Sequence, residues 1–222
     1  MREVDIMKCI KHPSIIEITD FFETNDTINI VMEHFSLSSL TEFTKNHRPL
    51  SDITTRSIIE QIAEALAYLH KMKIAHRDIK PENILINEGH QIKIIDLGLS
   101  LMGDHSETKV AGTPFYMSPE LLNKKQYDPF KADIWAFGVL LYWLVLGYFP
   151  QDTVSPRKKK GSKRFQLNFP VDMHPGIEYL IGKMLQEDPE ERVSAEEILC
   201  DTWVKPKDFK NEISKLMKNS EK

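Results

Sequence analysis

A run of polar residues, His-Arg-Asp-Ile-Lys-Pro-Glu-Asn, occupies positions 76–83 and brings three reactive side-chain types close together. Asp78 carries a carboxylate that can accept a proton, and Lys80 carries an amine that can follow a migrating anionic group. Asn83 offers an amide oxygen, a ligand that magnesium accepts. Together these side chains can position a reacting group and neutralise charge on it. The alternative is a polar turn without function.

A second carboxylate, Asp96, begins the tripeptide Asp-Leu-Gly directly after a predicted strand and thirteen residues after Asn83. An aspartate and a glycine at the end of a strand often form only a turn. Beside the run at 76–83, however, Asp96 adds a second hard oxygen ligand for a magnesium ion. The two stretches together indicate a metal-assisted reaction.

The elements around these residues are predicted from their hydrophobic periods. Residues 50–70 are expected to form a helix, because the apolar residues Ile58, Ile62, Leu66 and Leu69 fall on one face. Residues 84–86 and 91–95 read as two strands of a hairpin. Residues 76–83 therefore lie between a helix and a hairpin, and Asp96 follows the second strand.

The rest of the chain is predicted as one helix, two strands and a mainly helical body. A helix is expected at 4–10, a hairpin from 15–22 and 28–32, and a buried helix at 133–147, with further helices at 177–186 and 194–199. Residues 96–120 show neither a helical nor a strand period, and so long an irregular stretch in a compact domain is usually functional.

The composition is that of an ordinary globular domain. Of 222 residues, 41% are hydrophobic and 28% are charged, and the net charge of -4 gives no reason to expect nucleic-acid binding. Cys9 and Cys200 lie far apart without a metal-ligand pattern, which fits a reducing compartment. No apolar stretch is long enough for a clear membrane span, so no membrane partner is expected.

Together these stretches resemble the catalytic loop and the magnesium-binding motif of serine/threonine protein kinases. The segment Gly-Thr-Pro-Phe-Tyr-Met-Ser-Pro-Glu at 112–120 looks like the substrate-docking end of a kinase activation segment. Two details depart from the usual pattern: Leu97 replaces a phenylalanine, and Ser118 replaces an alanine. The resemblance runs from Glu3 to about Val204 and suggests the calcium/calmodulin-dependent or AMP-activated kinase-like groups.

The resemblance implies an α+β, protein kinase-like two-lobed fold, with an incomplete small lobe and a mainly α-helical large lobe. Residues 1–35 would be a remnant of the small lobe, 36–204 the large lobe, and 205–222 a lysine-rich tail. The implied activity is transfer of the γ-phosphate of ATP to serine or threonine hydroxyls of a protein substrate, with Mg2+.

The resemblance also implies individual roles. Asp78 would be the base, Lys80 a phosphate contact, and Asn83 and Asp96 the metal ligands. Thr113 would form a hydrogen bond with the catalytic aspartate, as the corresponding threonine does in serine/threonine kinases. The residues expected to contact the nucleotide are Glu33, Phe35, Lys80, Glu82, Asn83, Leu85 and Asp96.

Regulatory and structural roles follow from the same resemblance. Arg77 would receive a phosphate carried by the activation segment, with Thr108 closer to the usual position than Ser106. An upstream activating kinase would be the partner that adds this phosphate. The expected structural residues are Glu3 of the first helix, the pair Glu120 and Arg192, and Asp133, which would hold the backbone of the catalytic loop. His76 is expected to be a packed core histidine.

The printed sequence contains no Gly-x-Gly-x-x-Gly, and no lysine-bearing strand precedes Glu3. Three explanations stay open: a fragment of a longer kinase, a misplaced start, or a truncated pseudokinase that only binds partners. The joint presence of Asp78, Asn83 and Asp96 favours an active enzyme, although this chain by itself is expected to turn over poorly. A small-molecule kinase is a remote option. The expected location is the cytoplasm, or the nucleus if the basic run 157–164 acts as a targeting signal.

Overall fold

The computed structural model of the chain describes residues 10–24, 27–36, 38–103, 106–123, 126–150 and 167–206. Several sequence predictions lie outside the described residues. They are Glu3 and nearly all of the helix expected at 4–10, the basic run 157–164, and most of the lysine-rich tail.

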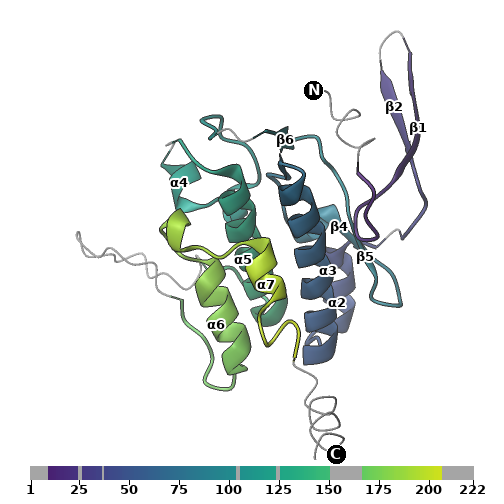
Figure 1. Ribbon diagram of the computed structural model, residues 1–222. Coiled ribbons are helices and arrows are strands. Elements are labelled where there is room, and N and C mark those ends of the chain that lie inside the picture. The colour runs from purple at the N-terminus through teal and green to yellow at the C-terminus, as the bar shows by residue number, and fades with distance from the viewer. Residues whose placement is uncertain are drawn as a thin grey trace, which may run out of the picture.

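The helical body is built around two long helices that cross the core, α3 (Asp52–Lys71) and α5 (Pro129–Leu146), with α6 (Pro175–Met184) packed on α5 and α7 (Ala195–Leu199) packed on α3 (Figure 1). Helix α3 begins where the Ser51 hydroxyl accepts a hydrogen bond from the backbone N–H of Thr54. The apolar face predicted for this helix is fully buried, and its members are Ile58, Ile62, Leu66 and Leu69.

Helix α5 is apolar on all sides and lies in the centre of the body. It begins four residues earlier than predicted, because the Asp128 carboxylate caps the first turn and Pro129 occupies the first position. It ends at Gly147, whose φ of 86° is a left-handed conformation. By length and composition, with 18 residues and a mean hydropathy of 1.4, this helix could cross a membrane, but 72% of it is buried within the protein. That burial is typical of a core helix.

Helix α2 (Leu40–His47) is absent from the sequence predictions, which gave only the boundary between the small-lobe remnant and the large lobe, after residue 35. Ser39 caps the start of this helix. Ser39 accepts a hydrogen bond from the backbone N–H of Glu42, and the Glu42 carboxylate accepts one from the backbone N–H of Ser39. Leu40 and Phe43 then anchor the helix in the core.

The described strands form three two-stranded antiparallel sheets. The predicted hairpins are confirmed as β1 (Ile18–Glu23) with β2 (Ile28–Met32), and β4 (Ile84–Ile86) with β5 (Ile92–Ile94). The third sheet pairs β3 (Ile74–Ala75) with β6 (Leu101–Met102). Strand β6 and the single turn η2 (Pro114–Tyr116) lie within residues 96–120, and the short helix α4 (Pro119–Leu122) begins there, so the expectation that this stretch is wholly irregular was wrong.

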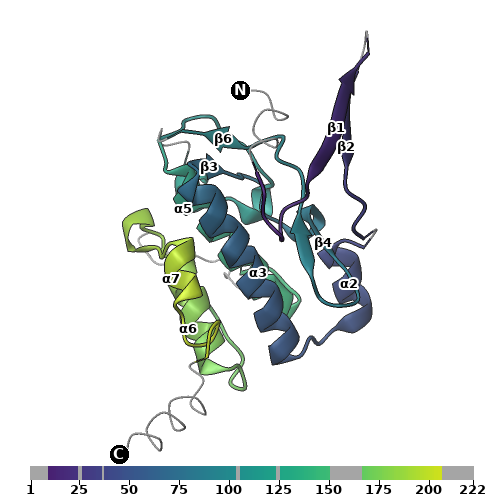
Figure 2. The ribbon, with the colours of Figure 1, turned by 45° about the vertical axis from the view of Figure 1, so that its right-hand side comes forward.

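The β1–β2 hairpin projects away from the helical body, as Figures 1 and 2 both show. Its base is tied to β5, since Ile94 donates a backbone hydrogen bond to Ser14 and accepts one from Ile16. Three large apolar side chains on this hairpin are exposed to solvent: Phe22, Val31 and Met32.

Candidate active site

The loop that follows β3 holds the Asp78 carboxylate in a closed set of hydrogen bonds. Lys80 Nζ donates to Asp78 Oδ2 at 2.6 Å, and Thr113 Oγ1 donates to Asp78 Oδ1 at 2.8 Å. Asn83 Nδ2 donates to Asp78 Oδ2 at 3.1 Å and to the Asp78 carbonyl at 2.9 Å. Lys80 Nζ also donates to Thr113 Oγ1 at 2.9 Å. The four side chains predicted to be catalytic therefore meet at one point.

The environment of Asp78 keeps this carboxyl group ionised. Burial alone raises its pKa, but hydrogen bonds from Lys80 and Thr113, together with the Lys80 charge, outweigh burial and hold the pKa below its ordinary value. The side chain is only 8% exposed, so its lone pairs face these few donors rather than bulk water. A positioned carboxylate of this kind can orient a hydroxyl and accept its proton.

Asp133, at the start of the core helix α5, holds the backbone of the catalytic loop, as the sequence predicted. Its Oδ1 accepts the backbone N–H of Arg77 at 2.7 Å, and its Oδ2 accepts the backbone N–H of His76 at 2.8 Å. Arg77 has a φ of 69°, a left-handed conformation that a non-glycine residue adopts only when its surroundings impose it. The two hydrogen bonds from this buried carboxylate supply that constraint.

His70, near the end of α3, also contacts Asp133 and was not singled out in the sequence. Its Nε2 lies 3.0 Å from Asp133 Oδ2, so the carboxylate receives three nitrogen donors. No local motif marks His70, because its partner lies 63 positions away in the sequence.

His76 is buried completely, which confirms the prediction of a core histidine. Its Nδ1 accepts the backbone N–H of Asp78, and its Nε2 lies 3.2 Å from the carbonyl oxygen of Ile95. Burial lowers the pKa of this imidazole, while the nearby carboxylate of Asp133 acts in the opposite direction. A neutral His76 thus links the catalytic loop to the end of β5.

The two predicted metal ligands lie at the same end of the β4–β5 hairpin. The backbone N–H of Ile95, the residue before Asp96, donates to the carbonyl of Asn83 at 2.9 Å. The amide nitrogen of Asn83 donates to Asp78. The amide oxygen of Asn83, Oδ1, accepts no hydrogen bond from the described residues. One oxygen of the exposed Asp96 accepts the backbone N–H of Gly98, and the other has no partner there. These oxygens fit a magnesium ion, which uses few protein ligands and completes its shell with water and phosphate oxygens.

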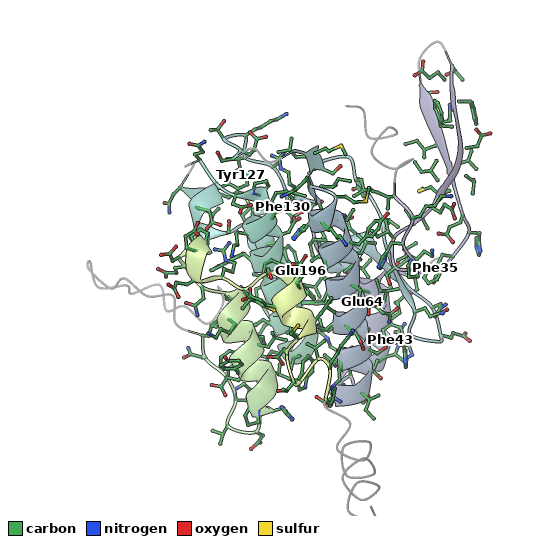
Figure 3. All side chains as sticks on the ribbon, in the orientation of Figure 1. Phe35, Phe43, Glu64, Tyr127, Phe130 and Glu196 are labelled. Atoms are coloured by element: carbon green, nitrogen blue, oxygen red, sulfur yellow. The ribbon has the colours of Figure 1, made fainter. Side chains whose placement is uncertain are left out.

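The residues predicted to contact the nucleotide flank the link between the hairpin and the helical body. Phe35 lies at the foot of the β1–β2 hairpin (Figure 3), and no described residue bonds to its backbone N–H or C=O. The backbone N–H of Glu33 donates to Glu17 at 3.0 Å, so only its carbonyl is open. Leu85 turns away from the core-facing side of β4, and Glu82 is exposed beside Asn83. The open backbone groups of Phe35 and Glu33 suit the polar edge of a purine ring.

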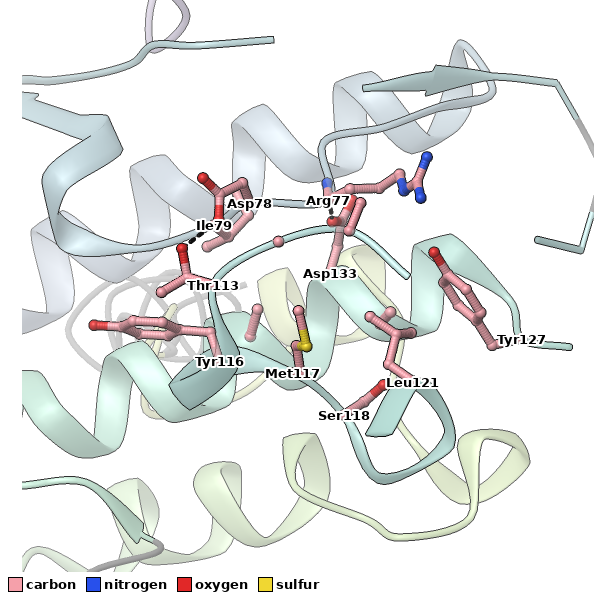
Figure 4. Close-up of a pocket in the computed structure, with 14 residues that line it drawn as sticks. Arg77, Asp78, Ile79, Thr113, Tyr116, Met117, Ser118, Leu121, Tyr127 and Asp133 are labelled. Carbon is pink, nitrogen blue, oxygen red and sulfur yellow. Dashed lines mark hydrogen bonds between the residues drawn. The ribbon is translucent and has the colours of Figure 1, made fainter. Parts of the chain in front are cut away.

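Residues 96–120 correspond to the activation segment. The part of this segment around Gly112 lies directly on the catalytic loop. Gly112 has a φ of 110°, and a Cβ there would stand 2.6 Å from the carbonyl oxygen of Arg77, so only glycine fits. Between this segment, the catalytic loop and α5 lies a cavity of about 20 Å³ (Figure 4), which has room for about one water molecule. The cavity is too small to admit a substrate. Its lining includes Asp78, Thr113 and Asp133.

The predicted pair of Glu120 and Arg192 is confirmed. Arg192 donates to both carboxylate oxygens of Glu120, at 2.8 and 3.2 Å, and is only 1% exposed. Its guanidinium also donates to the carbonyls of Lys131 and Gln186, and lies over the ring of Trp135. A buried charge with this many partners fixes the end of the activation segment to the helical body.

Arg77, the predicted phosphate receiver, is directed at the activation segment. Its Nη2 donates to the carbonyl of Lys109 at 2.6 Å, and its Nη1 lies 3.6 Å from Glu107 Oε2. Glu107 was not singled out in the sequence. Thr108, the predicted phosphate carrier, is exposed and directly adjoins these residues.

Comparison with known proteins gives the same assignment as the geometry. The family model described as "Protein kinase domain" matches residues 1–204. The chain belongs to the protein kinase family. With that match, the expected fold is also confirmed: mixed helices and strands, a helical large lobe, and a small lobe with few strands.

The similar proteins are serine/threonine kinases. The chain is 34% identical over 208 residues to CBL-interacting serine/threonine-protein kinase 15 of Arabidopsis thaliana, covering 91% of this kinase chain and 49% of that protein. It is 36% identical over 206 residues to Aurora kinase of Candida glabrata, covering 91% of this chain and 57% of that protein. For maternal embryonic leucine zipper kinase of Xenopus tropicalis the identity is 36% over 208 residues, with 91% and 32% covered. The chain spans about half the length of the first two relatives.

Proposed function

We propose that this protein transfers the γ-phosphate of ATP to serine or threonine hydroxyls of a protein substrate. The observation that carries the proposal is the Asp78 carboxylate, which Lys80, Thr113 and Asn83 hold from different sides. These three donors fix the direction of the carboxylate, as a base that accepts a proton from a bound hydroxyl requires. The serine/threonine kinases to which the chain is similar support the same activity.

In the proposed reaction, the substrate hydroxyl oxygen forms a bond to the γ-phosphorus, and the bond between that phosphorus and the bridging oxygen of ADP breaks. The hydroxyl proton passes to Asp78, and Lys80 neutralises charge on the transferred phosphoryl group. Thr113 holds Asp78 in the orientation that meets the hydroxyl. Most of the rate enhancement comes from this positioning and from electrostatics.

A magnesium ion held by Asn83 and Asp96 would neutralise the phosphate charges of the nucleotide. The free Oδ1 of Asn83 and the free carboxylate oxygen of Asp96 support this assignment. The backbone of Phe35 and the carbonyl of Glu33 would bind the adenine edge, with the Leu85 side chain against its face. Glu82 would lie beside the nucleotide and the substrate.

Regulation through Thr108 is part of the proposal. An upstream kinase would add a phosphate there, and Arg77 would be its receiver, because both lie within the same contact region. A Thr108→Ala protein would then resemble the phosphatase-treated wild type. If the Thr108→Ala protein and the phosphatase-treated wild type are both fully active, phosphorylation of Thr108 does not regulate the enzyme.

The proposed function is tested with the full-length protein, Mg2+, labelled ATP and a generic protein substrate. Asp78→Ala should lower turnover about 10²- to 10⁴-fold, the range for the loss of a positioned base. The matched control is Glu88→Ala, an exposed carboxylate in the β4–β5 turn. Labelled phosphate should be recovered as phosphoserine or phosphothreonine. Undiminished turnover by Asp78→Ala, at an unchanged melting temperature, would rule the assignment out.

A further inference from the structure

The guanidinium of Arg77 has partners within the chain itself. Its side chain is 7% exposed and runs from the catalytic loop toward the region of Tyr127 in Figure 4. There it donates to the Lys109 carbonyl at 2.6 Å and faces the Glu107 carboxylate at 3.6 Å. Among the described residues, Glu107 is the carboxylate that forms an ion pair with this buried cation.

The two oxygens of Glu107 have different partners. Oε1 accepts the backbone N–H of Thr108 at 2.7 Å and that of Lys109 at 2.8 Å. Oε2 is the atom that faces Arg77. The pKa of this carboxyl lies below its ordinary value. The backbone hydrogen bonds from Lys109 and Thr108 lower the pKa most, and the positive charge of Arg77 lowers it further. The carboxylate thus joins the activation segment to the catalytic loop.

The backbone of Glu107 is anchored independently of Arg77. Its N–H donates to the carbonyl of Tyr127 at 2.9 Å, and its C=O accepts the N–H of Tyr127 at 3.0 Å. The Tyr127 hydroxyl donates to the carbonyl of Lys109 at 3.2 Å, and the Tyr127 ring packs with Leu121 and Ala132. Because the backbone of Glu107 is held by Tyr127, the Glu107 carboxylate can determine where the Arg77 side chain lies.

The position of Arg77 matters because its backbone connects directly to Asp78 and contacts two other parts of the site. Its N–H is bound by Asp133, its C=O lies against Gly112, and the next residue is Asp78. Rotation of this residue would move the Asp78 carboxylate and the segment that carries Thr113 together. A charge that fixes the Arg77 side chain therefore also fixes the geometry around Asp78.

We infer that Glu107 is a positioning residue, whose carboxylate is the resident counter-charge of Arg77 and holds residues 106–112 on the catalytic loop without an added phosphate. The effect on phosphoryl transfer rests on the proposed function, whereas the structural effect does not. A phosphate on Thr108 would be a second anion beside Glu107, so the two would share or compete for Arg77.

The structural test is amide hydrogen exchange on full-length, phosphatase-treated protein. Glu107→Gln keeps an oxygen for the Thr108 and Lys109 amides but removes the charge, while Glu107→Ala removes both. Exchange in residues 106–112 should rise roughly 1.5- to fivefold in Glu107→Gln, as expected for a partly exposed ion pair, and more in Glu107→Ala. Glu88→Gln, a loss of the same charge on the exposed β4–β5 turn, should leave this segment unchanged. Equal exchange in Glu107→Gln and wild type would overturn the inference.

The functional test compares the same proteins in the phosphoryl-transfer assay. Glu107→Gln should lower kcat several-fold while leaving the KM for ATP unchanged, because Glu107 lies apart from the predicted nucleotide contacts. Phosphatase-treated Thr108→Ala should behave as phosphatase-treated wild type, since the hydroxyl makes no contact with Arg77 in the described structure. If Thr108→Ala instead loosens the segment and Glu107→Gln does not, the hydroxyl holds it and the inference fails. If exchange responds to Glu107→Gln but even the wild type transfers no phosphate, the proposed function fails and the positioning of Arg77 stands.

Discussion

Glu120 and Arg192 form a pair of hydrogen bonds, at 2.8 and 3.2 Å, across 72 positions of the sequence, and the guanidinium is almost fully buried. This contact joins the end of the activation segment to the part of the chain between α6 and α7. Its energetic importance lies in what remains when one partner is removed, because an unpaired charge would then be left in the core.

Removal of the Glu120 carboxylate should therefore unfold the large lobe more easily. We expect Glu120→Ala to lower the free energy of unfolding by about 3–5 kcal/mol, measured by urea denaturation, because Arg192 keeps its charge without its counter-ion. The control is Lys205→Ala, which breaks exposed pairs with Glu60 and Glu64 and should change stability by at most about 1 kcal/mol. Equal losses in the two variants would show that the buried pair is not distinct from a surface pair.

Gly112 should not tolerate a side chain. In Gly112→Ala, the new Cβ would meet the Arg77 carbonyl oxygen at 2.6 Å, and the φ of 110° is unfavourable for alanine. We expect a loss of about 1–3 kcal/mol in stability, with faster hydrogen exchange in the catalytic loop. The matched control is Gly182→Ala in α6, where no atom lies within 4 Å of the new Cβ. That variant should gain about 0.5–1 kcal/mol. A neutral Gly112→Ala would contradict the close approach.

His70 should support the catalytic loop through Asp133. His70→Phe leaves the buried Asp133 carboxylate one donor short, which should cost about 1–3 kcal/mol and speed exchange of the His76 and Arg77 amides. His70→Gln can place an N–H near the position of Nε2 and should recover most of the loss. If His70→Gln is destabilised and His70→Phe is not, ring packing against Phe130, not the hydrogen bond, is what His70 provides.

His76 should make stability fall in mild acid. Burial lowers the pKa of its imidazole in the folded protein, so the unfolded chain binds the proton more readily than the folded one does. The stabilisation is therefore complete above the unfolded pKa of about 6.5 and is lost as pH falls below it, by up to about 1.4 kcal/mol per pH unit. Urea midpoints at pH 7.5 and 5.5 measure this slope. His76→Gln should flatten it, and an equal slope in both proteins would assign the acid sensitivity to other groups, such as His12.

Local patterns identified much of the site in advance. The capped α3, the loop at 76–83 and the β4–β5 hairpin all follow from neighbouring residues, because periodicity and turn chemistry act over a few positions. Helix α2 shows the limit of such patterns. Its capping box is present in the sequence, at Ser39 and Glu42, but the sequence analysis placed no helix there.

Residue type and spacing were enough to predict a site at Asp78, Asn83 and Asp96, since both are local properties of one loop and one hairpin. Only the tertiary structure brought His70 to Asp133 and Glu107 to Arg77, across 63 and 30 positions respectively. Those contacts depend on how α3, α5 and the activation segment pack against each other. Helix packing is set by apolar surfaces that many residues share, so it leaves no signature at the individual polar side chains that it brings together.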